Sequence, residues 1–152
     1  MDDAQAALDQ ALDAFEPSIA SQARVGLAFF TDRFPAAHRL AYDNYNALAI
    51  GFASGEKQSS IAFSVTLYPR WVSLFFTRGT ELVDPAKLLT GNGTRIRHVV
   101  LKDGLIHESD AVLGLVDQAI DNLEPPLNPA AEGMLIIKSI SPKQRPRRPQ
   151  SQ

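Results

Sequence analysis

Apolar residues recur every three or four positions over the first 34 residues, which is the period of an amphipathic helix. In "DDAQAALDQALDAF", residues 2–15, acidic side chains fall on a separate stripe. Pro17 marks a bend or a new helix start, and Pro35 ends the second pattern. We therefore expect two helices, over 2–15 and 18–33. The apolar positions are Leu8, Leu12, Phe15, Ile19, Ala23, Leu27, Phe30 and Phe34.

From residue 38 the apolar period changes to two, which indicates strands. "HRLAYD" and "NALAIGFA" are followed by "SIAFSVTLY" and then "RWVSLFFT". In the third of these segments the alternation places Ile61 on one face with Phe63, Val65 and Leu67. The pattern predicts an antiparallel meander that begins at His38.

The third and fourth segments favour one hairpin register, with Tyr68 opposite Trp71 around Pro69-Arg70. A slip of one residue would mix apolar and polar faces. Pro-Arg is not a favoured two-residue hairpin turn, so a wider loop is the alternative. The register pairs Leu67 with Val72, Val65 with Leu74 and Phe63 with Phe76 on the apolar face, and Thr66 with Ser73 and Ser64 with Phe75 on the other.

The remaining segments complete the predicted domain. They are a short helix near 85–90, a strand over 95–101, a helix after Ser109 as N-cap, a linker over 124–133 and a last strand over 134–140. Together these elements predict an α+β two-layer sandwich of mostly antiparallel sheet with helices on one face. We expect one domain over 1–140 and a disordered, basic, Pro-rich tail over 141–152.

Three aromatic side chains point away from the helices in this arrangement. Tyr68, Trp71 and Phe75 lie beside a floor of small residues, which is typical of a site that binds a ligand or protein partner. In the alternative, the N-terminal helix, the last strand or a second copy of the chain in a homodimer covers this face. The floor consists of Ala47, Ala49, Gly51, Ala62, Ser64, Thr66 and Ser73.

Composition narrows the function classes. The 152 residues include no cysteine, which excludes disulfides, thiolate metal sites and thiol nucleophiles. No apolar run reaches the roughly 20 residues of a membrane span, and no signal peptide is visible. We expect a cytoplasmic protein with no membrane contact. No acid, base and nucleophile occur at a spacing typical of catalysis, so we expect no enzyme.

The charge is unevenly distributed. Residues after position 137 hold 5 of the 15 basic residues and no acid, which leaves 10 basic and 17 acidic residues, a net charge of −7, before them. The tail cations lack interleaved aromatics, and the acidic body repels polyanions, so nucleic acid is an unlikely partner. The tail is either solvated or folded back on the acidic first helix.

Residues 38–122 resemble the YdhG-like domains, a family of largely unknown function grouped with the frataxin-like fold. The resemblance rests on "YDNYNALAIGF", on "YPRWVSLFFTRGTELVDPAKLLTGNGTRIRHVVL" and on "LVDQAI" in the closing helix. It covers somewhat more than half of the chain. It implies a two-layer helix and sheet fold, and, through relatives described as frataxin-like iron chaperones, a role in delivering ferrous iron.

The iron hypothesis points to carboxylates of the first helix. Asp9, Asp13 and Glu16 share a face at i, i+4 and i+7, and carboxylates suit a weakly bound ferrous ion. The solvent-exposed side of an ordinary amphipathic helix has the same pattern. No tightly held cofactor is expected. His98, in the strand "RIRHVVL", is interpreted as a structural residue among aliphatic neighbours.

Overall fold

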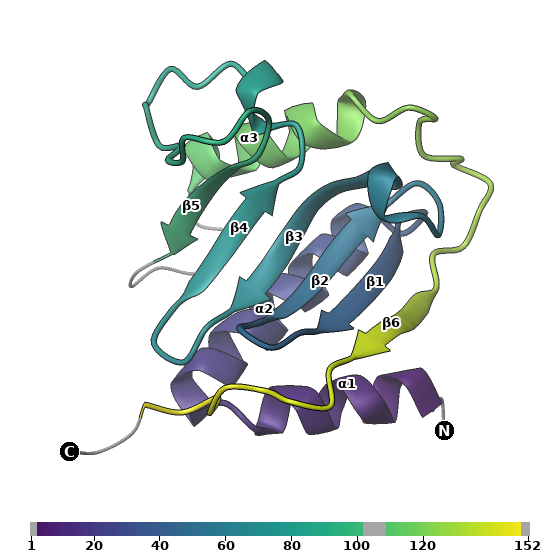
Figure 1. Ribbon diagram of the computed structural model, residues 1–152. Helices are drawn as coiled ribbons and strands as arrows, with labels where there is room; N and C mark the ends of the chain where they lie inside the picture. Colours follow the sequence, from purple (N-terminus) through teal and green to yellow (C-terminus); the bar gives the residue numbers. More distant parts are fainter. Residues whose placement is uncertain (1–2, 102–108, 150–152) are drawn as a thin grey trace.

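A six-stranded sheet carries helices α2 and α3 on one face and leaves the other face uncovered (Figure 1). The structure is a computed structural model that describes residues 3–101 and 109–149. Asp2 and residues 150–152 of the predicted tail lie outside the described residues. The elements are α1 (Asp3–Asp13), α2 (Pro17–Arg33), β1 (His38–Asp43), β2 (Leu48–Ala53), β3 (Ile61–Leu67), β4 (Val72–Phe76), β5 (Arg97–Leu101), α3 (Asp110–Asp121) and β6 (Leu135–Ile140), with 3-10 turns η1 (Gln58–Ser60) and η2 (Gly79–Glu81).

The strand order is β5-β4-β3-β2-β1-β6. Every neighbouring pair is antiparallel except β1 and β6, which run parallel. The predicted α+β sandwich of mostly antiparallel sheet is therefore confirmed. A parallel pair needs a long crossover, and the chain supplies it by running through β2 to β5 and α3 before β6.

The predicted register of the β3–β4 hairpin is confirmed. Phe63 pairs with Phe76 and Leu67 with Val72. The Tyr68 amide donates to the Trp71 carbonyl over 2.9 Å, which closes a tight turn around Pro69-Arg70. Pro at the first central position suits such a turn because its φ is already fixed near the required value.

The predicted side-chain directions of the first two residues of β3, Ile61 and Ala62, are wrong. The register between β2 and β3 shifts at Ala53, which pairs with Ile61. This irregularity turns the Ile61 side chain to the open face, where it packs with Leu40. It covers Gly51 so closely that a Cβ there would lie 2.7 Å from the Ile61 Cδ1 atom. Ala62, expected on the open floor, joins the main core instead.

Phenylalanine rings fill the space between α2 and the sheet. Phe30 of α2 lies edge-on to Phe63 with ring centroids 4.9 Å apart. Phe52 stacks on Phe63 at 4.8 Å, and all three rings are fully buried. Val116 of α3 extends this core beside the same sheet face. Burial of these rings supplies much of the driving force that holds the helices on the sheet.

Local signals explain where the helices begin and where one predicted helix fails. The Ser109 side chain accepts a hydrogen bond from the Val112 amide, so the predicted N-cap is confirmed. The predicted helix near 85–90 is wrong. The Asp84 carboxylate accepts hydrogen bonds from the amides of Leu88 and Leu89, which fixes a turn in place of a helix.

The C-terminal segment 141–149 differs from the expected solvated tail. Arg147 is buried and its guanidinium lies 2.8 Å from the Asp43 carboxylate. It also donates to the carbonyls of Asn44 and Tyr45, and it lies over the Phe15 ring. These partners replace the water that Arg147 loses, so the segment lies along α1 and the β1–β2 turn (Figure 1).

Close backbone contact at Gly133 yields a first prediction. The Gly133 amide donates to the Pro35 carbonyl over 2.9 Å. A Cβ at Gly133 would collide with the Ala37 carbonyl, whose carbon would lie 2.7 Å away. We expect Gly133→Ala to lower the free energy of unfolding by about 1–3 kcal/mol, because backbone atoms must move. Urea denaturation measures this change.

Gly93→Ala is the matched control for that substitution. A Cβ at Gly93 would meet nothing within 4 Å. We expect its urea midpoint to stay close to that of the unaltered protein. Equal midpoints for both variants would contradict the close approach of the Gly133 segment to the chain before β1.

Candidate functional site

The open sheet face carries four aromatic side chains in one continuous line, which we call the aromatic platform: Trp71, Tyr68, Phe75 and His98. Tyr68 and Trp71 stack with ring centroids 5.1 Å apart, and Phe75 and His98 stack at 5.0 Å. Tyr68 and Phe75 join the two pairs at 6.5 Å. The structure thus brings together the three predicted aromatics and adds a histidine.

Alternation along β4 and the tight turn explain how the predicted aromatics meet. Phe75 faces away from the core, as Trp71 and Tyr68 do at the two ends of the turn. His98 reaches them because β5 pairs with β4, which places it opposite Phe75. Its Nε2 lies 3.1 Å from the Thr90 hydroxyl, which holds the ring in place.

Sequence reasoning missed His98 because alternation cannot tell which face of β5 is open. Twenty residues lie between Phe76 and Arg97, so no tight turn fixes this register. The available signal is weak: Val99 and Leu101 share one face, but Ile96 and Val100 are as apolar and share the other face with His98. Only the pairing with β4 places His98 outward beside the aromatics.

Exposure differs sharply across the aromatic platform. The Trp71 side is open, with 40% of the residue exposed, whereas Ser73 beneath it is only 1% exposed. The buried Ser73 hydroxyl has no hydrogen-bond partner among the described residues. Burial also raises the pKa of the Tyr68 hydroxyl, which therefore stays protonated and able to donate.

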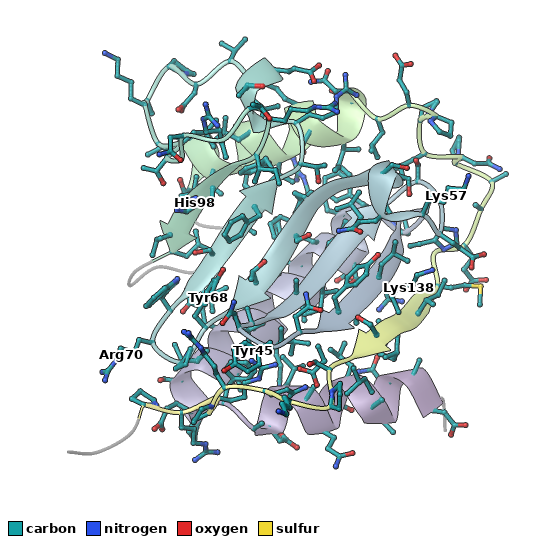
Figure 2. The ribbon with its side chains drawn as sticks, viewed as in Figure 1. Tyr45, Lys57, Tyr68, Arg70, His98 and Lys138 are labelled. Carbon is teal, nitrogen blue, oxygen red and sulfur yellow. The ribbon has the colours of Figure 1, made fainter. Side chains whose placement is uncertain are left out.

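A groove of about 560 Å³ opens beside Trp71. Its walls come from the β3–β4 turn, from the β1–β2 turn and from the C-terminal segment. The groove is lined by Asn46, Tyr68, Pro69, Arg70, Trp71, Arg145, Pro146, Arg148 and Pro149. Figure 2 shows Tyr45, Tyr68 and Arg70 gathered at this end of the sheet.

The arginines of the groove are held in different ways. Arg145 lies over the Tyr45 ring at 5.6 Å, and its amide donates to the Tyr45 carbonyl. Arg148 donates to the carbonyls of Ala14 and Asp13 at the end of α1. Arg70 is exposed in the turn, and none of the ion pairs between described residues involves it. The groove is therefore positively charged.

Carboxylates are almost absent from the sheet. Within the six described strands, Asp43 is the single acidic residue, and Arg147 neutralises it at the edge of the C-terminal segment. The other acidic residues that the structure describes lie on the helices and loops. Among the described residues, the open face consequently presents rings, aliphatic and small side chains, with cations beside them, although the chain as a whole has a net charge of −2.

The predicted iron carboxylates do not form one helical face. α1 ends at Asp13, and Glu16 lies beyond it as the N-cap of α2, because Pro17 starts a separate helix. Arg24 of α2 contacts the carboxylates of both Asp9, at 3.0 Å, and Asp13, at 2.6 Å. Among residues 3–101 and 109–149, no group of three or more His, Asp or Glu side chains is placed to hold a metal ion.

A second prediction follows from the Arg24 contacts. A guanidinium between Asp9 and Asp13 competes with any cation for the same oxygens. We expect anaerobic titration with ferrous iron to leave the α1 amide signals in NMR spectra without localised broadening. Saturable broadening at Asp9 and Asp13 that strengthens in Arg24→Ala would contradict this expectation and restore the iron hypothesis.

No helix in the described part of the chain is long and apolar enough to cross a membrane. Comparisons with models of protein families, with curated proteins and with solved structures find no match to this chain.

Proposed function

We propose that this chain is a non-catalytic binding domain that holds a ligand or partner on the open sheet face, at the aromatic platform. The observation that carries the proposal is the exposure of Trp71 while it stacks on Tyr68. Exposed tryptophan and tyrosine rings offer large contact areas that lose little conformational entropy on binding. An uncovered face with this composition is therefore suited to bind a ligand or a protein partner.

The composition of the open face supports the same proposal. A sheet face that meets only water usually carries polar side chains at alternate positions. Here Phe75 and Tyr68 stand at those positions, and Thr66 and Ser73 beneath them are buried. A partner that binds this face would remove apolar surface from water and would desolvate few polar groups.

The proposal includes membership of the YdhG-like family and a cytoplasmic location. The YdhG-like assignment is supported by the motif "YPRWVSLFF", whose residues form the β3–β4 turn, β4 and three members of the aromatic platform. A cytoplasmic location is supported by the lack of cysteine.

Tryptophan fluorescence tests whether the open face is free. Trp71 is the only tryptophan, so all emission reports on this site. We expect acrylamide to quench the emission of the free protein efficiently. Blue-shifted emission that acrylamide does not reach would overturn the proposal, because the face would already be covered.

Chemical-shift mapping tests whether the face binds. Labelled protein is titrated with an unpaired oligonucleotide, an acidic peptide and a proline-rich peptide. We expect at least one probe to shift the amides of Ser64, Ser73 and Phe75 and to leave α2 unchanged. Shifts confined to α2, or no shifts with any probe, would overturn the proposal.

A further inference from the structure

We propose that the partner of the aromatic platform is single-stranded nucleic acid, with a base stacked on Trp71 and phosphates at Arg70 and Arg145. The inference rests on the proposed function and names the chemistry of its ligand. Three independent features carry it: the stacked rings, the arginine groove and the scarcity of carboxylates in the described strands.

The rings of the aromatic platform stack on one another in two pairs, and Trp71 is the exposed member. Trp71 and Tyr68 form one stacked pair and Phe75 and His98 the other, with 6.5 Å between the Tyr68 and Phe75 centroids. Figure 2 shows Tyr68 beside the β3–β4 turn and His98 on the edge strand β5, which mark the two ends of the sheet region that the rings occupy. Every base has a π face, so a base of any kind can stack on the exposed ring of Trp71.

The groove places cations at one end of the aromatic platform. Arg70 is next to Trp71 in the chain and lines the same groove as Arg145. Arg145 is fixed by its backbone hydrogen bond to Tyr45 and by the contact of its guanidinium with the Tyr45 ring. Phosphates bound here would be beside a base stacked on Trp71, which is the geometry that a single strand needs.

Charge segregation removes the main objection to a polyanion. The strands contain one carboxylate, that of Asp43, and Arg147 lies 2.8 Å from it. Arg24 similarly pairs with Asp9 and Asp13 on α1 and α2, away from the open face. The sequence showed tail cations without interleaved aromatics. The fold supplies Tyr45 and Trp71 beside those cations in space.

The ring and charge pattern favours an unpaired strand over other partners. A duplex hides its base faces inside the stack and would use the arginines alone. An acidic peptide would likewise bind the arginines and make no stacking contact with the rings. A purely apolar partner would bury Arg70 and Arg145 without compensation, which is costly.

Fluorescence anisotropy of a labelled unpaired oligonucleotide of about ten nucleotides tests the inference. We expect saturable binding that weakens at least about fivefold in Trp71→Ala, because one stacking contact is lost. Trp71→Phe keeps an aromatic face and should retain most of the affinity. Trp71 is exposed, so neither variant threatens the core.

Salt dependence tests the arginines separately. We expect Arg70→Ala to reduce the slope of log affinity against log salt by about 0.7, as for one lost phosphate contact. Arg33→Ala is the matched control. It removes the same charge from α2, where Arg33 pairs with Asp117, and should leave the slope unchanged.

Three outcomes would overturn the inference. They are no saturable anisotropy change, equal affinity for a duplex of the same sequence, and affinity that neither Trp71→Ala nor Arg70→Ala reduces. If a peptide shifts the open-face amides and the oligonucleotide does not, this inference fails and the proposed function stands. If no probe shifts them, both fail.

Discussion

Replacing Phe63 by alanine is expected to lower the free energy of unfolding by about 3–5 kcal/mol, which is typical of a large aromatic side chain removed from a core. Phe63 is fully buried and its ring contacts those of Phe30, Phe52 and Phe76. The loss leaves a cavity between α2 and the sheet that these rigid rings cannot fill. Such a loss is a large fraction of the stability of a small domain.

Urea denaturation measures this effect, and Phe75→Ala is the matched control. Both changes remove the same atoms from adjoining strands, but Phe75 lies half-buried on the open face. We expect the control to cost less than half as much. Equal losses would mean that the open face is as well covered as the core, which would also contradict its proposed role.

Replacing Arg147 by alanine is expected to release the C-terminal segment from the body. The Arg147 and Asp43 side chains are only 5% and 15% exposed, and loss of one partner of a buried ion pair costs about 3 kcal/mol or more. The Arg145 amide, which donates to the Tyr45 carbonyl over 2.9 Å, should then exchange with solvent about 100-fold faster. Amide hydrogen exchange measures this change.

Arg148→Ala is the control for release of the segment. It removes the same charge, but Arg148 is exposed and donates only to backbone carbonyls, at 3.2 and 3.3 Å. We expect little change at the Arg145 amide. Arg147→Lys should behave like Arg147→Ala, because an ammonium cannot reach the carboxylate and both turn carbonyls together. Full protection in Arg147→Ala would show that the segment is held by other contacts.

The sequence predicted well in the β3–β4 hairpin and at two helix starts, where neighbours in the chain decide the structure. Alternation in β3 and β4 with a turn at Pro69-Arg70 determines the hairpin register, and the register brings Tyr68, Trp71 and Phe75 together. Pro17 and Ser109 mark helix starts through their own backbone chemistry.

The sequence failed where distant partners decide. Asp43 and Arg147 lie 104 positions apart, and nothing local indicates that one neutralises the other. His98 joins the aromatic platform only through the pairing of β5 with β4. Ile61 changes face because of an irregular register with β2, which alternation within β3 cannot reveal. Two errors were local: α1 ends at Asp13, which separates Glu16 from the acidic stripe, and Asp84 fixes a turn in place of the helix predicted near 85–90.

The parallel pairing of β6 with β1 has a consequence for the order of folding during synthesis. α1, the first helix to be synthesised, packs against β6. β1 also lacks its outer neighbour in the sheet until β6 has been synthesised. Until residue 140 has left the ribosome, β1 is an unprotected sheet edge, and Leu8 and Leu12 lack their final cover. A chain interrupted before β6 should therefore be a substrate for chaperones, because its exposed edge and apolar helix invite aggregation.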